Sequence, residues 1–328
     1  MESKKILLSR IFPGAGADLL KKEGFNVTTW TEERPMTQDE LIEAALHHHA
    51  LFSTVTDNLD QTFLRACPHL EIISQFGVGY DNIDIEEATR LGIPVGYTPG
   101  AMSDATADVA FGLMIAASRK MFFLHKKIIR GEWGYFDPNG DLGIELKHKT
   151  LGIIGMGRIG IEMARRCKGA FNMKIIYHNR RPNLHAEQEL DALYVDFETL
   201  LRKSDVLSVH CALSHETRGL FNKEAFEKMK PSSIFINTSR GTVHNEDDLF
   251  EALKKGIIWG AGLDVTNPEP MNPGNELLQM ENVAILPHIG SATIEARNEM
   301  ARMAAENIIG FYTSKHIPHM VNLSLFSK

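Results

Sequence analysis

The sequence predicts an α/β protein whose chain forms two domains built on parallel sheets. The first observation is the length of 328 residues, which exceeds one ordinary compact core and fits two. The second is the alternation of short apolar runs with helical patterns, which is typical of βα units. The third is a pattern of strand, glycine-rich turn and helix that starts only at residue 151, so a separate domain must precede it.

The first hundred residues are expected to form a compact α/β unit of ordinary domain size. The expected strands are 4–11, 25–30, 50–55, 70–77 and 92–100. A helix is expected at 16–24, where Gly24 closes it, and another at 59–67. The fifth strand ends in a Pro-Gly turn, which completes the unit.

A second series of strands and helices begins at Thr150. A long helix from Asp104 to about Arg130 and an irregular connection over 131–143 are expected to precede it. The strands predicted for this doubly wound sheet are 150–155, 174–179, 206–211, 233–238, 260–265 and 283–288. The tail is predicted to be helical over 294–314, with apolar positions spaced for one buried face.

Composition excludes several classes of function. The net charge of −7 and a pI near 6.1 supply no basic face, so nucleic acid is not an expected partner. Cys67, Cys167 and Cys211 are odd in number and far apart, so no disulfide is expected and a reducing, cytoplasmic location is favoured. The apolar segment 105–118 falls short of a membrane span. The consecutive histidines 47–49 suit no single metal, and no metal site is expected.

The turn "LGIIGMGRIG" (151–160) predicts a dinucleotide-binding site. Gly155 allows a sharp turn, Gly157 lets a pyrophosphate approach the backbone, and Gly160 lets helix and strand pack closely. The helix that opens at Arg158 and Ile159 directs its first amides and its dipole toward the phosphates. An ordinary glycine turn is the alternative, but the strand before it and the amphipathic helix after it favour the cofactor.

The end of the next strand bears on which dinucleotide is bound. An NAD site normally has an acidic residue about twenty positions after the glycines, whereas this chain has "HNRR". A guanidinium can hold a 2′-phosphate through two hydrogen bonds, so Asn179, Arg180 and Arg181 favour NADP(H) over NAD(H), with NAD(H) still possible. A solvated basic turn is the alternative.

Three residues that follow late strands have the chemistry of a keto-acid reduction. Such a reaction needs a cation for the carboxylate, a proton donor for the carbonyl oxygen and a group that orients the donor. Arg240, His288 and Glu269 meet these needs in that order. Each alone could be a surface residue or part of an ion pair; beside a dinucleotide loop, they predict an active site. A second glycine loop at Val78 and Gly79 could offer two amides to a small anion, although alone it is better read as a structural turn.

Several longer stretches carry a resemblance to a known family. They are "GVGYDNID", "SDATADVAFGLM", "LGIIGMGRIG", "INTSRGTVHNEDDL", "GAGLDVTNPEP" and "ILPHIGSAT". Together they resemble the D-isomer-specific 2-hydroxyacid dehydrogenases, and within that family most closely the glyoxylate/hydroxypyruvate reductases. The chain departs from the family pattern at Ala212, where proline is common, and at His148, where glycine is frequent.

The resemblance implies a fold and a set of roles. Two Rossmann-like domains are expected: a dinucleotide-binding domain (101–293) inserted in a smaller flavodoxin-like substrate, or catalytic, domain (1–100 plus 294–328). Val78 and Gly79 would bind the substrate carboxylate through their amides, with Val55 beside them. The cofactor would be contacted by Thr106, Gly155, Gly157, Arg158, Ile159, Gly160, Asn179, Arg180, Arg181, Ala212, Thr217, Thr238, Asp264 and Gly290.

The hypothesis is an NADPH-dependent reduction of short 2-oxo acids, glyoxylate and hydroxypyruvate, to D-2-hydroxy acids. Arg240 would contact carboxylate and carbonyl, His288 would be the acid/base, and Glu269 would bond to its far nitrogen. A 2-ketogluconate reductase of the same family is the nearest rival, and a dinucleotide-sensing, corepressor-like binding protein is the rival from another class. The segment "EWGYF" and the helix from Asp104 resemble the family's dimer-forming region, so a homodimer is expected.

Overall fold

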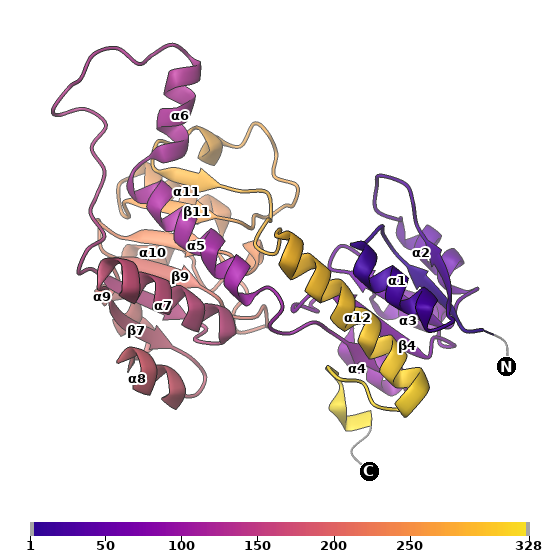
Figure 1. The fold of residues 1–328 in the computed structure, drawn as a ribbon. Coiled ribbons are helices and arrows are strands. Elements are labelled where there is room, and N and C mark those ends of the chain that lie inside the picture. The colour runs from indigo at the N-terminus through magenta and orange to yellow at the C-terminus, as the bar shows by residue number, and fades with distance from the viewer. Residues whose placement is uncertain (1–2, 326–328) are drawn as a thin grey trace. The chain divides into compact units, whose positions relative to one another are not determined.

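A computed structural model describes residues 3–325, and in it the chain divides into two compact units. We call Met1–Met102 together with Ala292–Lys328 the terminal unit, and Ser103–Ser291 the central unit. Both are α/β with parallel sheets, in agreement with the predicted fold class of two Rossmann-like domains (Figure 1). Each unit is described by itself.

The terminal unit contains a five-stranded parallel sheet of order β2-β1-β3-β4-β5. Its strands are β1 (Lys5–Leu8), β2 (Asn26–Thr29), β3 (Ala50–Thr54), β4 (Ile72–Phe76) and β5 (Val95–Gly96). Its helices are α1 (Gly14–Lys22), α2 (Gln38–Ala45), α3 (Gln61–Ala66), α4 (Ile85–Arg90), α12 (Ile294–Ser314) and the 3₁₀ turn η3 (Leu323–Leu325). All five predicted strands are present, shorter than the apolar runs that predicted them.

Alternation along the strands divides the core of the terminal unit between two faces of the sheet. Ile6 and Leu8 of β1 are buried in one cluster with residues of α12, whereas Leu7 is buried in another with residues of α2 and α3. Helix α12 lies along α1 (Figure 1). A Cβ on Gly16 of α1 would lie 2.7 Å from the carbonyl oxygen of Ala301, so a glycine is what allows this close approach.

The central unit contains a seven-stranded parallel sheet of order β12-β11-β10-β9-β6-β7-β8. Its strands are β6 (Thr150–Ile154), β7 (Lys174–His178), β8 (Leu193–Tyr194), β9 (Val206–Val209), β10 (Ile234–Asn237), β11 (Gly260–Leu263) and β12 (Val283–Ile285). The six predicted strands are present. The seventh, β8, is an edge strand of two residues, too short to give an alternation pattern. The strand order reverses between β6 and β9, where ligands bind in doubly wound sheets.

Helices cover both faces of the central sheet. One buried cluster contains residues of α5 (Ser103–Ser118), α7 (Arg158–Phe171) and α8 (Leu184–Leu190). The other contains residues of α9 (Phe197–Lys203), α10 (Lys223–Glu227) and α11 (Glu246–Lys254). Two 3₁₀ turns, η1 (Gly241–Val243) and η2 (Glu276–Gln279), complete the unit. No described helix is both long enough and apolar enough to cross a lipid bilayer.

The long helix predicted from Asp104 to Arg130 is wrong, because the structure has two helices there. Helix α5 ends at Ser118, and α6 (Met121–Ile129) begins after Lys120, which has a left-handed φ of 54°. No glycine or proline marks this break in the sequence, so the apolar periodicity predicted one continuous helix. The two helices differ in environment, since α5 is largely buried whereas α6 has no buried residue. The connection after α6 is irregular, as predicted.

Candidate active site

The glycine-rich turn of the central unit depends on the absence of side chains. Gly155, directly after β6, has a φ of +90°, and a Cβ there would lie 2.4 Å from the backbone nitrogen of Cys211. A Cβ on Gly160 would lie 2.6 Å from the carbonyl oxygen of Gly155. The turn is therefore sharp and the first turn of α7 is held close to it, as a dinucleotide loop requires.

Gly157 differs from both neighbouring glycines because the space around it is open. A Cβ at this position would meet no atom within 4 Å. Gly157 is the N-cap of α7, has no side-chain cap, and has an ordinary φ of −97°. The first amides of α7, from Arg158 and Ile159, thus begin at a bare, uncapped helix N-terminus, which suits a phosphate group.

Two asparagines hold this turn in place. The Met156 amide donates to Oδ1 of Asn179 at 2.7 Å, and the Met156 carbonyl accepts from Nδ2 of Asn183 at 2.9 Å. Behind them, the buried Tyr177 hydroxyl donates to Glu187 and accepts from the Asn183 amide, both at 2.7 Å. The end of β7 and the glycine turn after β6 are therefore one hydrogen-bonded assembly.

Arg180 and Arg181 follow Asn179 and are both exposed. The pKa of the Glu216 carboxyl is lowered, chiefly by the Ser214 hydroxyl that donates to it at 2.6 Å, and the positive charge of Arg180 also contributes. Thr217, in the same loop, donates to the carbonyl of Ala212 at 2.8 Å. The electrostatic effect of Arg180 thus reaches the loop after β9 that contains Ala212 and Thr217.

His288 and Glu269 form a hydrogen-bonded pair, with 2.8 Å between Nδ1 of His288 and Oε2 of Glu269. The other oxygen of Glu269 accepts from the Thr266 amide at 3.0 Å. Burial by itself would raise the pKa of Glu269, but the bond from His288 and its charge outweigh burial, with the charge of Arg240 contributing, so this pKa is lowered. The Glu269 carboxylate is consequently ionised, and its bond to His288 involves Nδ1 of the ring rather than Nε2.

The turn that carries His288 is held by Asp264. His288 has a left-handed φ of 53° and its amide donates to the Asp264 carbonyl at 2.9 Å. The two carboxylate oxygens of Asp264 accept the amides of Ile289 at 2.8 Å and Gly290 at 2.7 Å. Burial is the main cause of the raised pKa of Asp264. Thr106 of α5 donates to the Gly290 carbonyl at 3.1 Å, so Thr106, Asp264 and Gly290 lie together around the His288 turn.

Arg240 lies in the turn after β10. Its Nη1 donates to the Ser239 carbonyl at 2.8 Å. The preceding Thr238 is buried and its hydroxyl lies 3.4 Å from Nδ1 of His210. The positive charge of Arg240 acts on Glu269, so Arg240 lies near the His288–Glu269 pair within the central unit.

Val55, Val78 and Gly79 belong to the terminal unit, at the carboxyl ends of β3 and β4. A Cβ on Gly77 would lie 3.1 Å from Cγ1 of Val55, so the two loops are in contact. Nε2 of Gln75 donates to the Gly79 carbonyl at 3.3 Å and to Oδ1 of Asn82 at 2.9 Å. These bonds hold the Gly79 backbone and the Asn82 side chain against the end of β4.

Asn82 joins this loop to the one after β3. Its Nδ2 donates to the carbonyls of Thr54 at 3.2 Å and Asp57 at 2.8 Å. We did not predict roles for Gln75, Asn82 or Asn183. The available signal was their residue type, an amide side chain directly at or after a strand end, where loop backbone groups need partners.

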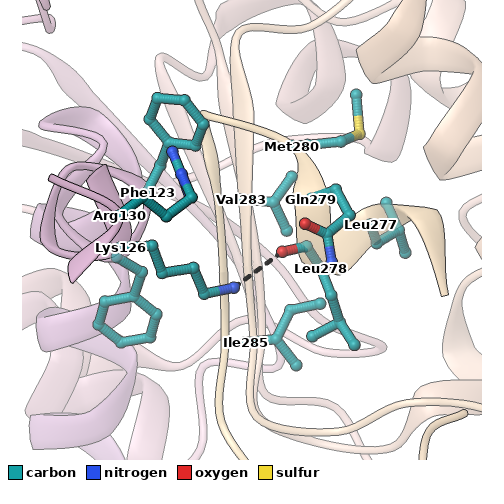
Figure 2. A pocket seen from close by; sticks show the side chains of 10 residues that line it. Phe123, Lys126, Arg130, Leu277, Leu278, Gln279, Met280, Val283 and Ile285 are labelled. Atoms are coloured by element: carbon teal, nitrogen blue, oxygen red, sulfur yellow. Dashed lines mark hydrogen bonds between the residues drawn. The ribbon is translucent and has the colours of Figure 1, made fainter. Parts of the chain in front are cut away.

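A separate cavity of about 130 Å³ lies in the central unit between α6, η2 and β12 (Figure 2). Lys126 of α6 reaches across it and donates to the Leu278 carbonyl at 3.0 Å. Phe123 and Arg130 line the same side, and Val283 and Ile285 line the other. None of the residues that line it is among the candidates described above.

Comparison with known proteins decides the family. Residues 111–290 match the family described as "D-isomer specific 2-hydroxyacid dehydrogenase, NAD binding domain". The chain belongs to this family. As a D-isomer specific 2-hydroxyacid dehydrogenase, it is an oxidoreductase with a nicotinamide-dinucleotide-binding domain, acting on the 2-oxo/2-hydroxy acid pair.

Full-length relatives and solved structures agree with this assignment. The chain is 45% identical to a glyoxylate reductase of Thermococcus litoralis over 97% of this chain and 96% of the relative. A glyoxylate reductase structure from Paecilomyes thermophila is 34% identical, has a TM-score of 0.87, and matches 99% of this chain and 100% of that one. An NADPH-dependent glyoxylate/hydroxypyruvate reductase of Sinorhizobium meliloti, solved with NADP and malonate, is 29% identical, with a TM-score of 0.85 and coverage of 98% and 97%.

Proposed function

We propose that this dehydrogenase reduces short 2-oxo acids, glyoxylate and hydroxypyruvate, to D-2-hydroxy acids with NADPH. The observation that carries the proposal is the His288–Glu269 pair in the same unit as the uncapped glycine turn, with the charge of Arg240 acting on Glu269. The names of the relatives, glyoxylate reductases among them, support the substrate class.

The residues of the glycine turn fit a dinucleotide, because Gly157 leaves open the space that a Cβ would fill. Gly155, Gly157, Gly160 and the amides at Arg158 and Ile159 would hold its phosphates, and a nicotinamide bound there supplies the hydride. Thr106, Thr238, Asp264 and Gly290 would complete the site, with Ala212 and Thr217 on the adenine side.

The protein side of the mechanism is proton donation and charge stabilisation. Nε2 of His288 donates a proton to the carbonyl oxygen of the substrate, while Nδ1 remains bonded to Glu269. The ionised Glu269 orients the imidazole and favours its protonated form. Arg240 binds the substrate carboxylate and stabilises the negative charge that develops on the carbonyl oxygen.

We assign the second substrate contact to the terminal unit, residues 1–100 plus 294–328 in the domain division expected from sequence. The amides of Val78 and Gly79 would bind the carboxylate, with Val55 beside them. The support is the hydrogen bond from Gln75 to the Gly79 carbonyl, which holds the backbone beside these two amides in place.

The reaction is tested with a panel of glyoxylate, hydroxypyruvate, 2-ketogluconate and pyruvate, each with NADPH and with NADH. The expected result is the highest kcat/KM for glyoxylate or hydroxypyruvate with NADPH. Preference for 2-ketogluconate would favour the sugar-acid reductase, and tight NADPH binding without turnover of any acid would favour the corepressor-like binding protein.

His288→Ala tests the assignment of the acid. Proton transfer contributes about 10²- to 10⁴-fold in rate, so kcat is expected to fall by that amount while the Kd for NADPH changes less than about twofold. His185→Ala, at an exposed side chain of α8, is the control and should leave kcat unchanged. Undiminished turnover by His288→Ala would refute the proposed acid.

The NADPH preference is proposed from Arg180, together with Asn179 and Arg181. Arg180→Ala should raise KM for NADPH about 10-fold or more and leave KM for NADH nearly unchanged, because only the former has a 2′-phosphate. Arg202→Ala, which removes an exposed arginine bonded to Glu198, is the matched control. Equal effects of Arg180→Ala on both cofactors would contradict the preference.

We also propose a homodimer, located in the cytoplasm. The support for the dimer is the exposure of large apolar side chains on and after α6: Met121, Ile128, Ile129, Trp133, Tyr135, Phe136 and Leu142. The support for a reducing compartment is that all three cysteines are free. Sedimentation velocity should give twice the chain mass for the natural protein and a monomer for Tyr135→Ser/Phe136→Ser; a monomeric natural protein would exclude the dimer.

A further inference from the structure

We propose that Asn237 and His244 form a brace that positions Arg240, a role that rests on the proposed function of that arginine. Asn237 is the last residue of β10 and is fully buried. His244 follows η1 and is 3% exposed. They lie on either side of the turn that presents Arg240, and neither is one of the residues we assign to the substrate or the cofactor.

The side chain of Asn237 is fully used within this turn. Its Oδ1 accepts from the amide and from the hydroxyl of Ser239, both at 2.9 Å. Its Nδ2 donates to the Arg240 carbonyl at 2.9 Å and lies 3.0 Å from Nδ1 of His244. The backbone groups leave no choice of orientation, because an amide donor must face oxygen and a carbonyl must face N–H.

This orientation determines the protonation of His244. Nδ2 of asparagine only donates, so Nδ1 of His244 must be an unprotonated acceptor, and the ring proton of the neutral form is on Nε2. The ring packs edge-on against Phe235, with 5.6 Å between centroids. Among residues 3–325, Nε2 has no hydrogen-bond partner. Burial lowers the pKa of His244 to about 4, consistent with a neutral ring. His244 thus acts as a hydrogen-bond acceptor rather than as an acid.

The braced turn also packs against the loop of Glu269. The amide of His244 donates to the Gly241 carbonyl at 3.1 Å. A Cβ on Gly241 would lie 2.0 Å from the carbonyl oxygen of Thr266, whose amide donates to Glu269. A displacement of the Arg240 turn would therefore press on the loop that holds the His288–Glu269 pair. The brace sets the position of the arginine relative to that pair.

The test removes the hydrogen-bond acceptor Nδ1 of His244 with little change in the volume of the side chain. His244→Leu removes Nδ1, whereas His244→Asn keeps an oxygen near its position. We expect His244→Leu to lower kcat for glyoxylate about 10-fold, with the Kd for NADPH changed less than about twofold, because small misplacements of a reacting group are costly. His244→Asn should retain kcat within about threefold. Leu249→Ala, a buried truncation in α11 outside the brace, should lower the melting temperature without lowering kcat.

The proposal would be overturned if His244→Leu kept the kcat and KM of the natural protein. It would also be overturned if His244→Asn or Leu249→Ala lost as much kcat as His244→Leu. If the natural protein reduces none of the 2-oxo acids, the proposed function fails, and the brace is then judged by ¹⁵N spectra of the imidazole at pH 7. A protonated Nε2 with an unprotonated Nδ1 supports the brace, and the opposite tautomer overturns it.

Discussion

Two glycine loops follow strands of parallel sheets in this chain, and we propose that they bind different anions. In the central unit, Gly155 to Gly157 lead directly into the 14-residue helix α7. In the terminal unit, Gly77 to Gly79 lead into a turn, and the six-residue helix α4 begins only at Ile85. The first loop is shaped by backbone crowding at Gly155, whereas the second is held by the side-chain amides of Gln75 and Asn82.

The difference supports the separate roles that we propose for the two loops. A long helix with an uncapped N-terminus supplies a dipole and several amides, enough for a pyrophosphate. The turn in the terminal unit, whose carbonyls accept hydrogen bonds from the protein, supplies about two amides, which is enough for one carboxylate. Both have two glycines at a spacing of two, so the local pattern G-x-G does not separate them.

The largest effect is expected at Gly155. Gly155→Ala places a Cβ on a residue with a φ of +90° and against the Cys211 backbone, so it should destabilise the protein by at least about 2 kcal/mol. Gly157→Ala, in open space, should change the free energy of unfolding by less than about 0.5 kcal/mol but weaken NADPH binding about 10-fold. Urea unfolding and fluorescence titration measure the two. Equal stability losses would show that crowding does not shape this loop.

Glu269→Gln touches neither glycine loop and so should affect only the chemical step. The lowered pKa of Glu269 keeps this carboxylate ionised at neutral pH, and the neutral glutamine cannot stabilise an imidazolium. Reduction should slow about 10- to 100-fold near pH 7.5, and the alkaline limb of the pH–rate profile should move to lower pH. An unmoved alkaline limb would argue against the pair. Unchanged binding of NADPH is the control.

Asn82→Ala should affect the glycine loop of the terminal unit and leave the glycine loop of the central unit unchanged. It removes one of the two acceptors of the Gln75 amide and leaves the Thr54 and Asp57 carbonyls without their bonds from Asn82, so KM for glyoxylate should rise about 5- to 10-fold and stability should fall about 1–3 kcal/mol. The Kd for NADPH should not change. Asn58→Ala, an exposed asparagine in the same unit, is the control. A matching loss of NADPH affinity would mean that the loops are not independent.

The smallest effect is expected at His148, which has a positive φ but is not sterically crowded. His148 has a φ of 61° and is exposed, and its ring lies 3.3 Å from the side-chain nitrogen of Asn172. His148→Gly should stabilise the protein by about 0.5–1 kcal/mol in thermal unfolding, since glycine adopts this conformation without strain. A destabilised His148→Gly would show that the ring contact outweighs the strain.

The sequence was informative where chemistry or periodicity is local. The strands around Gly155, and the charged residues Arg240, Glu269 and His288, follow from patterns a few residues long. The break at Lys120 could not be predicted, because it separates a helix buried in the unit from an exposed one, and burial is set by tertiary packing. Periodicity describes a helix face without saying where that face stops being covered.

The hydrogen bonds that hold the loops were also beyond sequence patterns. Asn82 bonds to the carbonyls of residues 25 and 28 positions away, and Asn183 bonds to Met156, 27 positions away. Asparagine at a strand end is common in any turn, so residue type alone does not identify the partner. Such pairings are known only when the strands that bring the loops together are placed.

The bond between Asn179 and Met156 limits how the coenzyme choice of this protein can be redesigned. A change of preference toward NADH would call for the substitution of an acidic residue at the end of β7. At position 179 an aspartate would keep an oxygen that can accept from the Met156 amide, but it would replace Nδ2, which lies 3.4 Å from the Met156 carbonyl, with a carboxylate oxygen that repels that carbonyl. The glycine turn would lose part of its support. Positions 180 and 181 are solvent-facing and can be altered without that penalty.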